Sequence, residues 1–190
     1  MNAPTLPSFG AKPKMINGKI VWSSGPSMRQ YFALPESIMY YMAMNPSSAE
    51  VYKKLIQSCK YFFEKNPILV AADIYGETTI CSKKECDGYD DEGRCCVKID
   101  LEKFSTKFWF THAFYLDNTD KPNFTSMLCP KIYRCEAKIL SLTDQNLMYD
   151  ELQFLGSSVE HIGLRFCQIT NADGSTVMLG EILGALPRYD

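Results

Sequence analysis

Four cysteines beside a polar stretch are the residues whose spacing comes closest to a chemical site. Cys81 and Cys86 are separated by four residues, and Cys95 is followed directly by Cys96. Thiolates can hold structural zinc in tetrahedral geometry, but no pair has the two-residue spacing of common zinc sites and no histidine is close by. We therefore predict ordinary thiols in a solvated loop and no bound metal. A zinc-stabilised binding module is the alternative.

Residues suited to catalysis are few. The chain has two histidines: His112 lies within an apolar segment, and His161 follows Glu160. A histidine in such a segment is typically a hydrogen-bonded structural residue, and the acidic run at 90–92 indicates a solvated loop. The sequence contains no nucleophile elbow, no phosphate-binding glycine loop and no His-Glu-x-x-His motif. These observations predict a protein that is not an enzyme and uses no cofactor.

Charge and composition narrow the classes of partner. The 190 residues include 20 basic and 22 acidic side chains, interleaved along most of the chain, with a formal net charge of −2. Because proteins that bind nucleic acid usually present a clustered basic surface, nucleic acid is disfavoured as a partner. Apolar residues make up 46% of the chain, which is enough to bury a core.

Targeting signals are also missing from the sequence. No segment reaches the roughly 18 to 20 apolar residues needed to span a bilayer, so no membrane association is expected. The first 18 residues lack the charged start and apolar stretch of a secretory signal. We therefore expect a cytoplasmic or nuclear protein whose eight cysteines are reduced thiols rather than a disulfide framework.

Two short helices are predicted between residues 34 and 67. Pro35 suits the first turn of the first helix, and Pro46 ends that helix. Ser47 and Glu50 have the spacing of a capping box at the start of the second helix. The second helix has an apolar stripe at spacings of four, four and three residues, formed by Val51, Leu55, Cys59 and Phe62.

The second half of the chain has the pattern of strands and a weak internal repeat. Segments rich in β-branched and aromatic residues predict strands at 96–101, 107–116 and 132–142. Three apolar positions recur after 22 residues: Leu140, Leu142 and Leu147 are followed by Ile162, Leu164 and Ile169. Helices are expected after each copy, at 150–156 and 177–186. A strand, a turn and a helix at this period are typical of leucine-rich repeats.

These elements predict an α/β (α+β) protein with a short helical module before a small repeat-like region of strands and helices. The expected divisions are a flexible leader at 1–32 with a short strand near residues 19–22, the helical module at 33–70, a polar linker at 71–95 and the repeat-like region at 96–190. A further strand would be expected after residue 190, which favours a truncated repeat region.

The helical segment resembles the F-box. The resemblance rests on the Leu-Pro-Glu-Ser-Ile sequence at 34–38 and on the segment 55–67, in which Ser-Cys-Lys-Tyr-Phe precedes a closing proline. The whole arrangement is similar to a nematode-expanded family of F-box-like proteins, in which a short box precedes a degenerate leucine-rich-repeat region. Residues 56–69, 132–154 and 173–187 carry that wider resemblance.

The resemblance implies that the box binds a Skp-type adaptor of a cullin ubiquitin ligase and that the repeat region selects an unknown client protein. Docking would place a helix in an apolar groove, where a few anchors supply most of the binding energy. The expected anchors are Leu34, Pro35, Ile38, Met42 and Leu55. Two alternatives stay open: these residues simply pack the helices together, or the strand face of the repeats binds a partner without any ligase.

Overall fold

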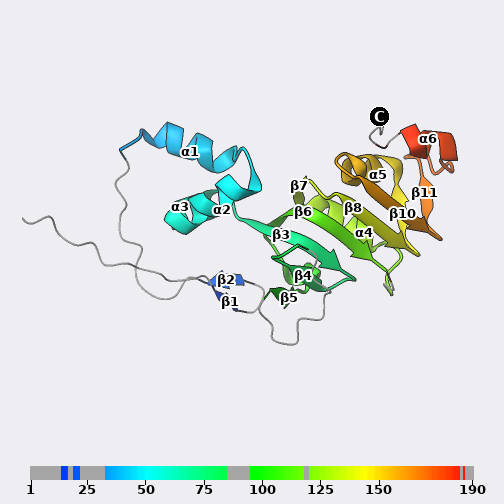
Figure 1. Cartoon of the computed structure of the whole chain (residues 1–190), viewed down its shortest axis with the longest axis horizontal. Helices are drawn as coiled ribbons and strands as arrows, with labels where there is room; N and C mark the ends of the chain where they lie inside the picture. Colours follow the sequence, from blue (N-terminus) through cyan, green and yellow to red (C-terminus); the bar gives the residue numbers. More distant parts are fainter. Residues whose placement is uncertain are drawn as a thin grey trace, which may run out of the picture.

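The computed structural model describes residues 14–16, 19–21, 33–84, 95–117, 120–184 and 186. Its helices and its sheet of parallel and antiparallel strands confirm the predicted α/β class (Figure 1). The short strand expected near residues 19–22 is β2 (Lys19–Val21), which pairs antiparallel with β1 (Lys14–Ile16).

Three helices precede the main sheet: α1 (Glu36–Met44), α2 (Ala49–Ser58) and α3 (Lys60–Lys65). The single second helix of the prediction is wrong, because Cys59 adopts an extended conformation between α2 and α3 and caps both. The Cys59 Sγ accepts a hydrogen bond from the Tyr61 amide at 3.3 Å. The cap of α2 is Ser48 rather than Ser47, since the Ser48 hydroxyl accepts from the Val51 amide at 3.2 Å.

Seven strands form the main sheet, in the order β10-β8-β6-β3-β4-β5, with β7 also paired to β6. The β3–β6, β6–β7, β6–β8 and β8–β10 pairs are parallel, whereas the β3–β4 and β4–β5 pairs are antiparallel. The strands are β3 (Ile68–Tyr75), β4 (Thr79–Cys81), β5 (Cys96–Lys98), β6 (Lys107–Leu116), β7 (Ile132–Cys135), β8 (Ile139–Thr143) and β10 (His161–Arg165).

A second, two-stranded sheet and short helices complete the fold. Strand β9 (Asn146–Met148) pairs parallel with β11 (Gln168–Thr170). The helical turns are η1 (Leu101–Lys103), α4 (Phe124–Leu128), η2 (Cys129–Lys131), α5 (Tyr149–Gly156) and α6 (Leu179–Gly184). Helix α6 lies within the predicted segment 177–186, and α5 covers the predicted segment 150–156 and begins one residue earlier.

The predicted linker at 71–95 is wrong over its first part, because β3 and β4 occupy residues 68–75 and 79–81. Strand β3 has the continuous apolar run of a parallel strand that is covered on both faces. The division after residue 70 cuts through this strand. The rest of the predicted linker, including Cys86 and the acidic run at 90–92, lies outside the described residues.

The 22-residue repeat corresponds to the register of the strands. Leu140 lies opposite Ile162 and Leu142 opposite Leu164 in the β8–β10 pair, and Leu147 lies opposite Ile169 in the β9–β11 pair. The turn is repeated as well, since Asp144 and Phe166, also 22 residues apart, both have positive φ angles, of 55° and 53°. Successive copies therefore stack in register, as in a solenoid.

Two apolar clusters lie on opposite faces of the sheet. The larger cluster, between the sheet and helices α4 and α5, includes Phe108, Phe114, Leu142 and Leu152. The smaller cluster lies on the other face, at the start of β3 and β6, where α2 packs against the sheet. It is formed by Ala49, Tyr52, Ile68, Val70 and Trp109, with Ile56 and Tyr133 at its margin.

Hydrogen bonds at this smaller cluster join the helical module to the sheet. The buried Tyr52 hydroxyl donates to the Asn66 carbonyl at 2.6 Å and accepts from the Ile68 amide at 3.1 Å. At the end of α1, the Asn66 side chain donates to the Ala43 carbonyl, and the Tyr133 hydroxyl donates to the next carbonyl along the chain. The module thus has a fixed orientation on the sheet.

Candidate functional site

The outer side of α1 is apolar. Leu34 is 49% exposed, Ile38 46% and Tyr41 65%. Pro35 and Tyr40 are exposed beside them. These five residues are called the α1 surface below. Three of the five anchors expected from the sequence, Leu34, Pro35 and Ile38, belong to it.

The other two expected anchors face inward. Met42 and Leu55 are partly buried and pack against the cluster formed by Met39, Ala43, Cys59 and Phe62. Much of their apolar area is therefore already used to hold α1 against α3. The structure separates the five expected anchors into an exposed group and a packing group.

Tyr40 and Tyr41 were missed as surface residues by the sequence reasoning. The available signal was that α1 carries apolar residues at nearly every position, more than one face of a helix can bury. A short helix of this kind leaves apolar side chains outside whichever face it packs. Large exposed apolar areas of this sort commonly mark interaction sites.

The open face of the parallel strands is a second surface with defined chemistry. In register across β3, β6, β8 and β10 lie Tyr75, Tyr115, Ser141 and Gly163. The rings of Tyr75 and Tyr115 are stacked, with centroids 5.0 Å apart and planes 10° apart. Both tyrosines are half-buried, whereas their neighbours Ile74 and Phe114 are fully buried. Tyr75, Tyr115, Asp117, Ser141 and Thr143 are called the strand face below.

Asp117 organises the polar part of the strand face. Its carboxylate accepts hydrogen bonds from the Thr143 hydroxyl at 2.6 Å and from the Ser141 hydroxyl at 3.2 and 3.3 Å. Ser141 and Thr143 come from β8, and Asp117 is the residue that follows β6. Because hydrogen bonds fix their orientations, a ligand would meet a preorganised polar patch beside two aromatic rings.

His112 forms the hydrogen bond expected of a structural histidine. Its Nδ1 lies 2.7 Å from the Oδ1 of Asp73, a carboxylate that is fully buried in β3. The hydroxyl of Tyr75 donates to the other oxygen of Asp73 at 3.5 Å. The β3–β6 pairing is irregular here, which brings residues 39 positions apart into contact. Asp73 lay in the segment predicted to be a linker, so sequence reasoning missed it.

Glu160, the residue before His161, forms an ion pair with Lys138, with the Lys138 Nζ and the Glu160 Oε1 2.7 Å apart. The hydrogen bond and the positive charge of Lys138 lower the pKa of Glu160. His161 itself is exposed at the start of β10.

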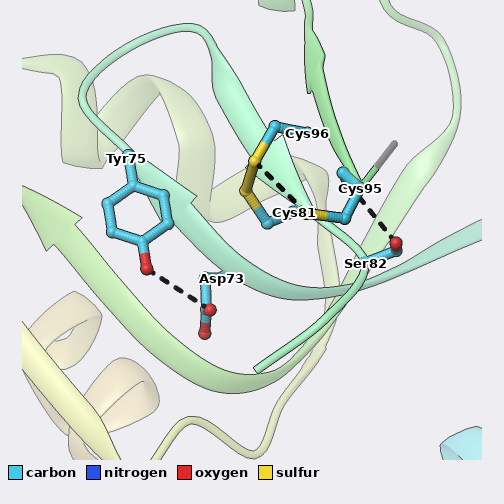
Figure 2. The surroundings of a disulfide bond; sticks show 6 residues. All are labelled: Asp73, Tyr75, Cys81, Ser82, Cys95 and Cys96. Carbon is cyan, nitrogen blue, oxygen red and sulfur yellow. Dashed lines mark hydrogen bonds between the residues drawn. A yellow bond between two sulfur atoms is a disulfide. The ribbon is translucent and has the colours of Figure 1, made fainter. Parts of the chain in front are cut away.

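The cysteines differ from the prediction of a fully reduced set, because Cys81 and Cys96 form a disulfide (Figure 2). The physical reason is the strand register: Cys81 of β4 lies directly opposite Cys96 of β5. Bonded sulfurs cannot act as thiolate ligands, so this state removes two of the four ligands considered for zinc. Among the described residues no group of three or more potential ligands could hold a metal ion.

Most of the other described cysteines are thiols of low reactivity. Burial raises the pKa of Cys129 to about 12 and that of Cys135 to about 11. Burial also raises the pKa of Cys59 and Cys167. A raised pKa means that little thiolate, the reactive form, is present at neutral pH.

These buried thiols predict a loss of stability in alkali. In the unfolded chain a thiol ionises near its ordinary pKa of 9.0, whereas Cys129 and Cys135 keep their protons in the folded protein. Above about pH 9 the unfolded state binds fewer protons, so the free energy of unfolding should fall as the pH rises. Urea titrations between pH 8 and about pH 11 measure this slope. A variant with Cys129→Ala and Cys135→Ala should show a flatter profile, and an unchanged slope would contradict the assignment.

No helix in the described part of the chain is long and apolar enough to cross a membrane. The geometry described above gives three candidate sites: the α1 surface, the strand face and the sulfur atoms at the β4–β5 edge. In comparisons with known proteins, the chain matches no family model, no curated protein and no solved structure.

Proposed function

We propose that this chain is a protein-binding adaptor whose α1 surface docks on a partner. By the resemblance to F-box-like proteins, that partner is a Skp-type adaptor of a cullin ubiquitin ligase, and the protein acts in the cytoplasm or the nucleus. The observation that carries the proposal is the exposure of Ile38 and Tyr41 on α1, a helix whose opposite face is already packed, together with the exposed Leu34 just before it.

The energetics favour binding over solvation for this surface. Burial of apolar surface contributes a free energy of about 25 cal/mol for each Å² removed from water, and these large side chains lack that contribution while they are exposed. Ile38 and Tyr41 lie three residues apart on α1, a spacing with which helices insert anchors into grooves, and Leu34 is exposed just before the N-cap Pro35. The backbone is held by the Asn66 and Tyr133 contacts, so little ordering is needed on binding.

Titration of the full chain with a purified Skp-type adaptor tests this proposal. We expect a dissociation constant in the micromolar range or tighter, and a loss of at least about 30-fold for Ile38→Asp, the effect of removing a central apolar anchor. The matched control is Phe166→Asp, which changes an exposed aromatic residue in a distant turn and should bind as the wild type does. Absence of wild-type binding at concentrations of about 10 μM would refute recruitment of this adaptor.

A second candidate function is supported by a separate observation, the stacked pair Tyr75–Tyr115 beside the Asp117 hydrogen-bond cluster. In this function the strand face binds a protein partner without any ligase. Cellular rescue with the double variant Leu34→Asp and Ile38→Asp distinguishes the two functions. Rescue by a variant that no longer binds the adaptor favours the second function, and failure of rescue with retained folding favours the first.

A further inference from the structure

Three sulfur atoms gather at the β4–β5 edge of the sheet (Figure 2). Cys81 and Cys96 are bonded across the two strands, and Cys95 immediately precedes β5. The Sγ of Cys95 lies 3.8 Å from the Sγ of Cys96. This distance corresponds to contact between the two sulfur atoms, so a thiol is placed directly beside a disulfide.

The described part of the chain is not built as a disulfide framework. The described cysteines outside this cluster are thiols at Cys59, Cys129, Cys135 and Cys167. Disulfides are rare in proteins of reducing compartments, and those that occur there are usually transient and take part in redox chemistry. One bond beside several thiols fits that class better than a structural framework.

Position in the sheet determines which sulfur an external thiol can reach. Cys81 is 1% exposed and lies under the edge, whereas Cys96 is partly exposed on the outermost strand. Strands β4 and β5 have three residues each, so few backbone hydrogen bonds hold β5 besides the disulfide. Attack from solvent is therefore directed at Cys96, with Cys81 as the leaving group.

We propose that Cys81, Cys95 and Cys96 form a thiol–disulfide exchange site whose co-reactant is a dithiol, either a small molecule or a protein. A thiolate of the dithiol attacks the Cys96 Sγ, and the electrons of the broken S–S bond leave on the Cys81 Sγ, which takes a proton from water. The second thiol of the dithiol then attacks its own sulfur in the mixed disulfide and releases the Cys96 thiolate, which is protonated in turn. The protein disulfide is reduced to two thiols, and the dithiol is oxidised to a disulfide.

Cys95 supplies an internal form of the same exchange. Its thiolate attacks the Cys96 Sγ, a Cys95–Cys96 bond forms, and the Cys81–Cys96 bond breaks. The Cys81 thiolate takes up the proton that Cys95 lost, so no electrons enter or leave the protein. This exchange releases the covalent link between β4 and β5 without an external reductant.

Mapping of alkylated peptides from the full chain tests the proposal. The protein is equilibrated with reduced and oxidised dithiothreitol, a small-molecule dithiol, at graded ratios, quenched with acid, alkylated with N-ethylmaleimide and digested. We expect a Cys81–Cys96 link under oxidising conditions, and alkylated Cys81 and Cys96 in a still folded protein under reducing conditions. Hydrogen exchange of the β4 and β5 amides should be faster after reduction, because the link between the strands is lost.

Two variants identify the part played by Cys95. Cys95→Ser should abolish the population linked between residues 95 and 96, and should slow the release of Cys81 by about tenfold or more, because a thiol already in contact is a far more effective nucleophile than one in solution. Cys167→Ser changes a half-buried thiol in a distant repeat and should behave as the wild type does. Exchange kinetics identical in the Cys95→Ser variant and the wild type would overturn the role of Cys95. A Cys81 that is never linked to Cys96, or is linked to Cys86 instead, would overturn the site.

Discussion

Replacing Trp109 with alanine should lower the free energy of unfolding by about 4 kcal/mol. Trp109 is fully buried in β6, and its ring packs with Tyr52 of α2 and Tyr133 of β7 at centroid distances of 6.4 and 5.7 Å. The Arg134 guanidinium lies over the same ring at 4.5 Å. Alanine would leave a cavity where the helical module meets the sheet, so both parts should lose stability together.

Urea denaturation followed by circular dichroism measures this loss. The matched control is Trp109→Phe, which keeps an aromatic ring and removes an indole Nε1 that has no hydrogen-bond partner among the described residues. Because an unsatisfied buried donor is itself unfavourable, we expect this control to cost only about 1 kcal/mol. A Trp109→Ala variant that loses less than about 1 kcal/mol would show that the helical module does not depend on this contact.

Replacing Asp73 with alanine should lower the free energy of unfolding by about 3 kcal/mol. Asp73 has no exposed surface, and its side chain accepts hydrogen bonds from His112 and Tyr75. Its removal leaves the Nδ1 of His112, a side chain that is only 13% exposed, facing an apolar cavity. A buried polar group without a hydrogen-bond partner destabilises the folded state, so the expected loss of stability exceeds that of an ordinary surface substitution.

A double-mutant cycle separates the pair from the effect of each side chain alone. We expect the variants Asp73→Ala and His112→Ala to be coupled by at least about 1 kcal/mol, since they remove the same hydrogen bond. The control cycle combines Asp73→Ala with Lys103→Ala, a substitution in an exposed ion pair that shares no partner with Asp73 and should be additive. Additive effects in the Asp73–His112 cycle would contradict a direct contact at the irregular pairing of β3 and β6.

Much of the fold follows from local pattern. The bounds of β6 match the predicted strand at 107–116, and its side chains that pack into the larger cluster are Phe108, Phe110, Phe114 and Leu116. The repeat was predicted for a related reason: two copies with the same alternation and the same turn conformation must place equivalent residues opposite one another. The predicted strand at 132–142 is divided into β7 and β8, both paired with β6. The segment between them still bonds to β6, through the backbone amides of Glu136 and Lys138.

The second helix shows how a tertiary contact overrides a local pattern. The predicted stripe put Val51 inside, but Val51 is exposed and Tyr52 is fully buried. Tyr52 is buried because its hydroxyl forms hydrogen bonds with the Asn66 carbonyl and the Ile68 amide, at the point where the chain enters β3. An apolar stripe in the sequence shows which side chains of a helix are apolar. It does not show which polar side chain of the helix will form hydrogen bonds with a distant part of the chain.

The sequence alone determined the class of fold, the helical character of the segment between residues 34 and 67, the period of the repeat and the apolar character of Leu34, Pro35 and Ile38. These features depend on neighbours within one helical turn or on alternation along one strand. The tertiary structure decided the Cys81–Cys96 bond, the Asp73–His112 pair, the stacked Tyr75 and Tyr115, and the exposure of the α1 surface. Each of these depends on which strands or helices pack together and in which register, and that choice is made by contacts between residues far apart in the chain.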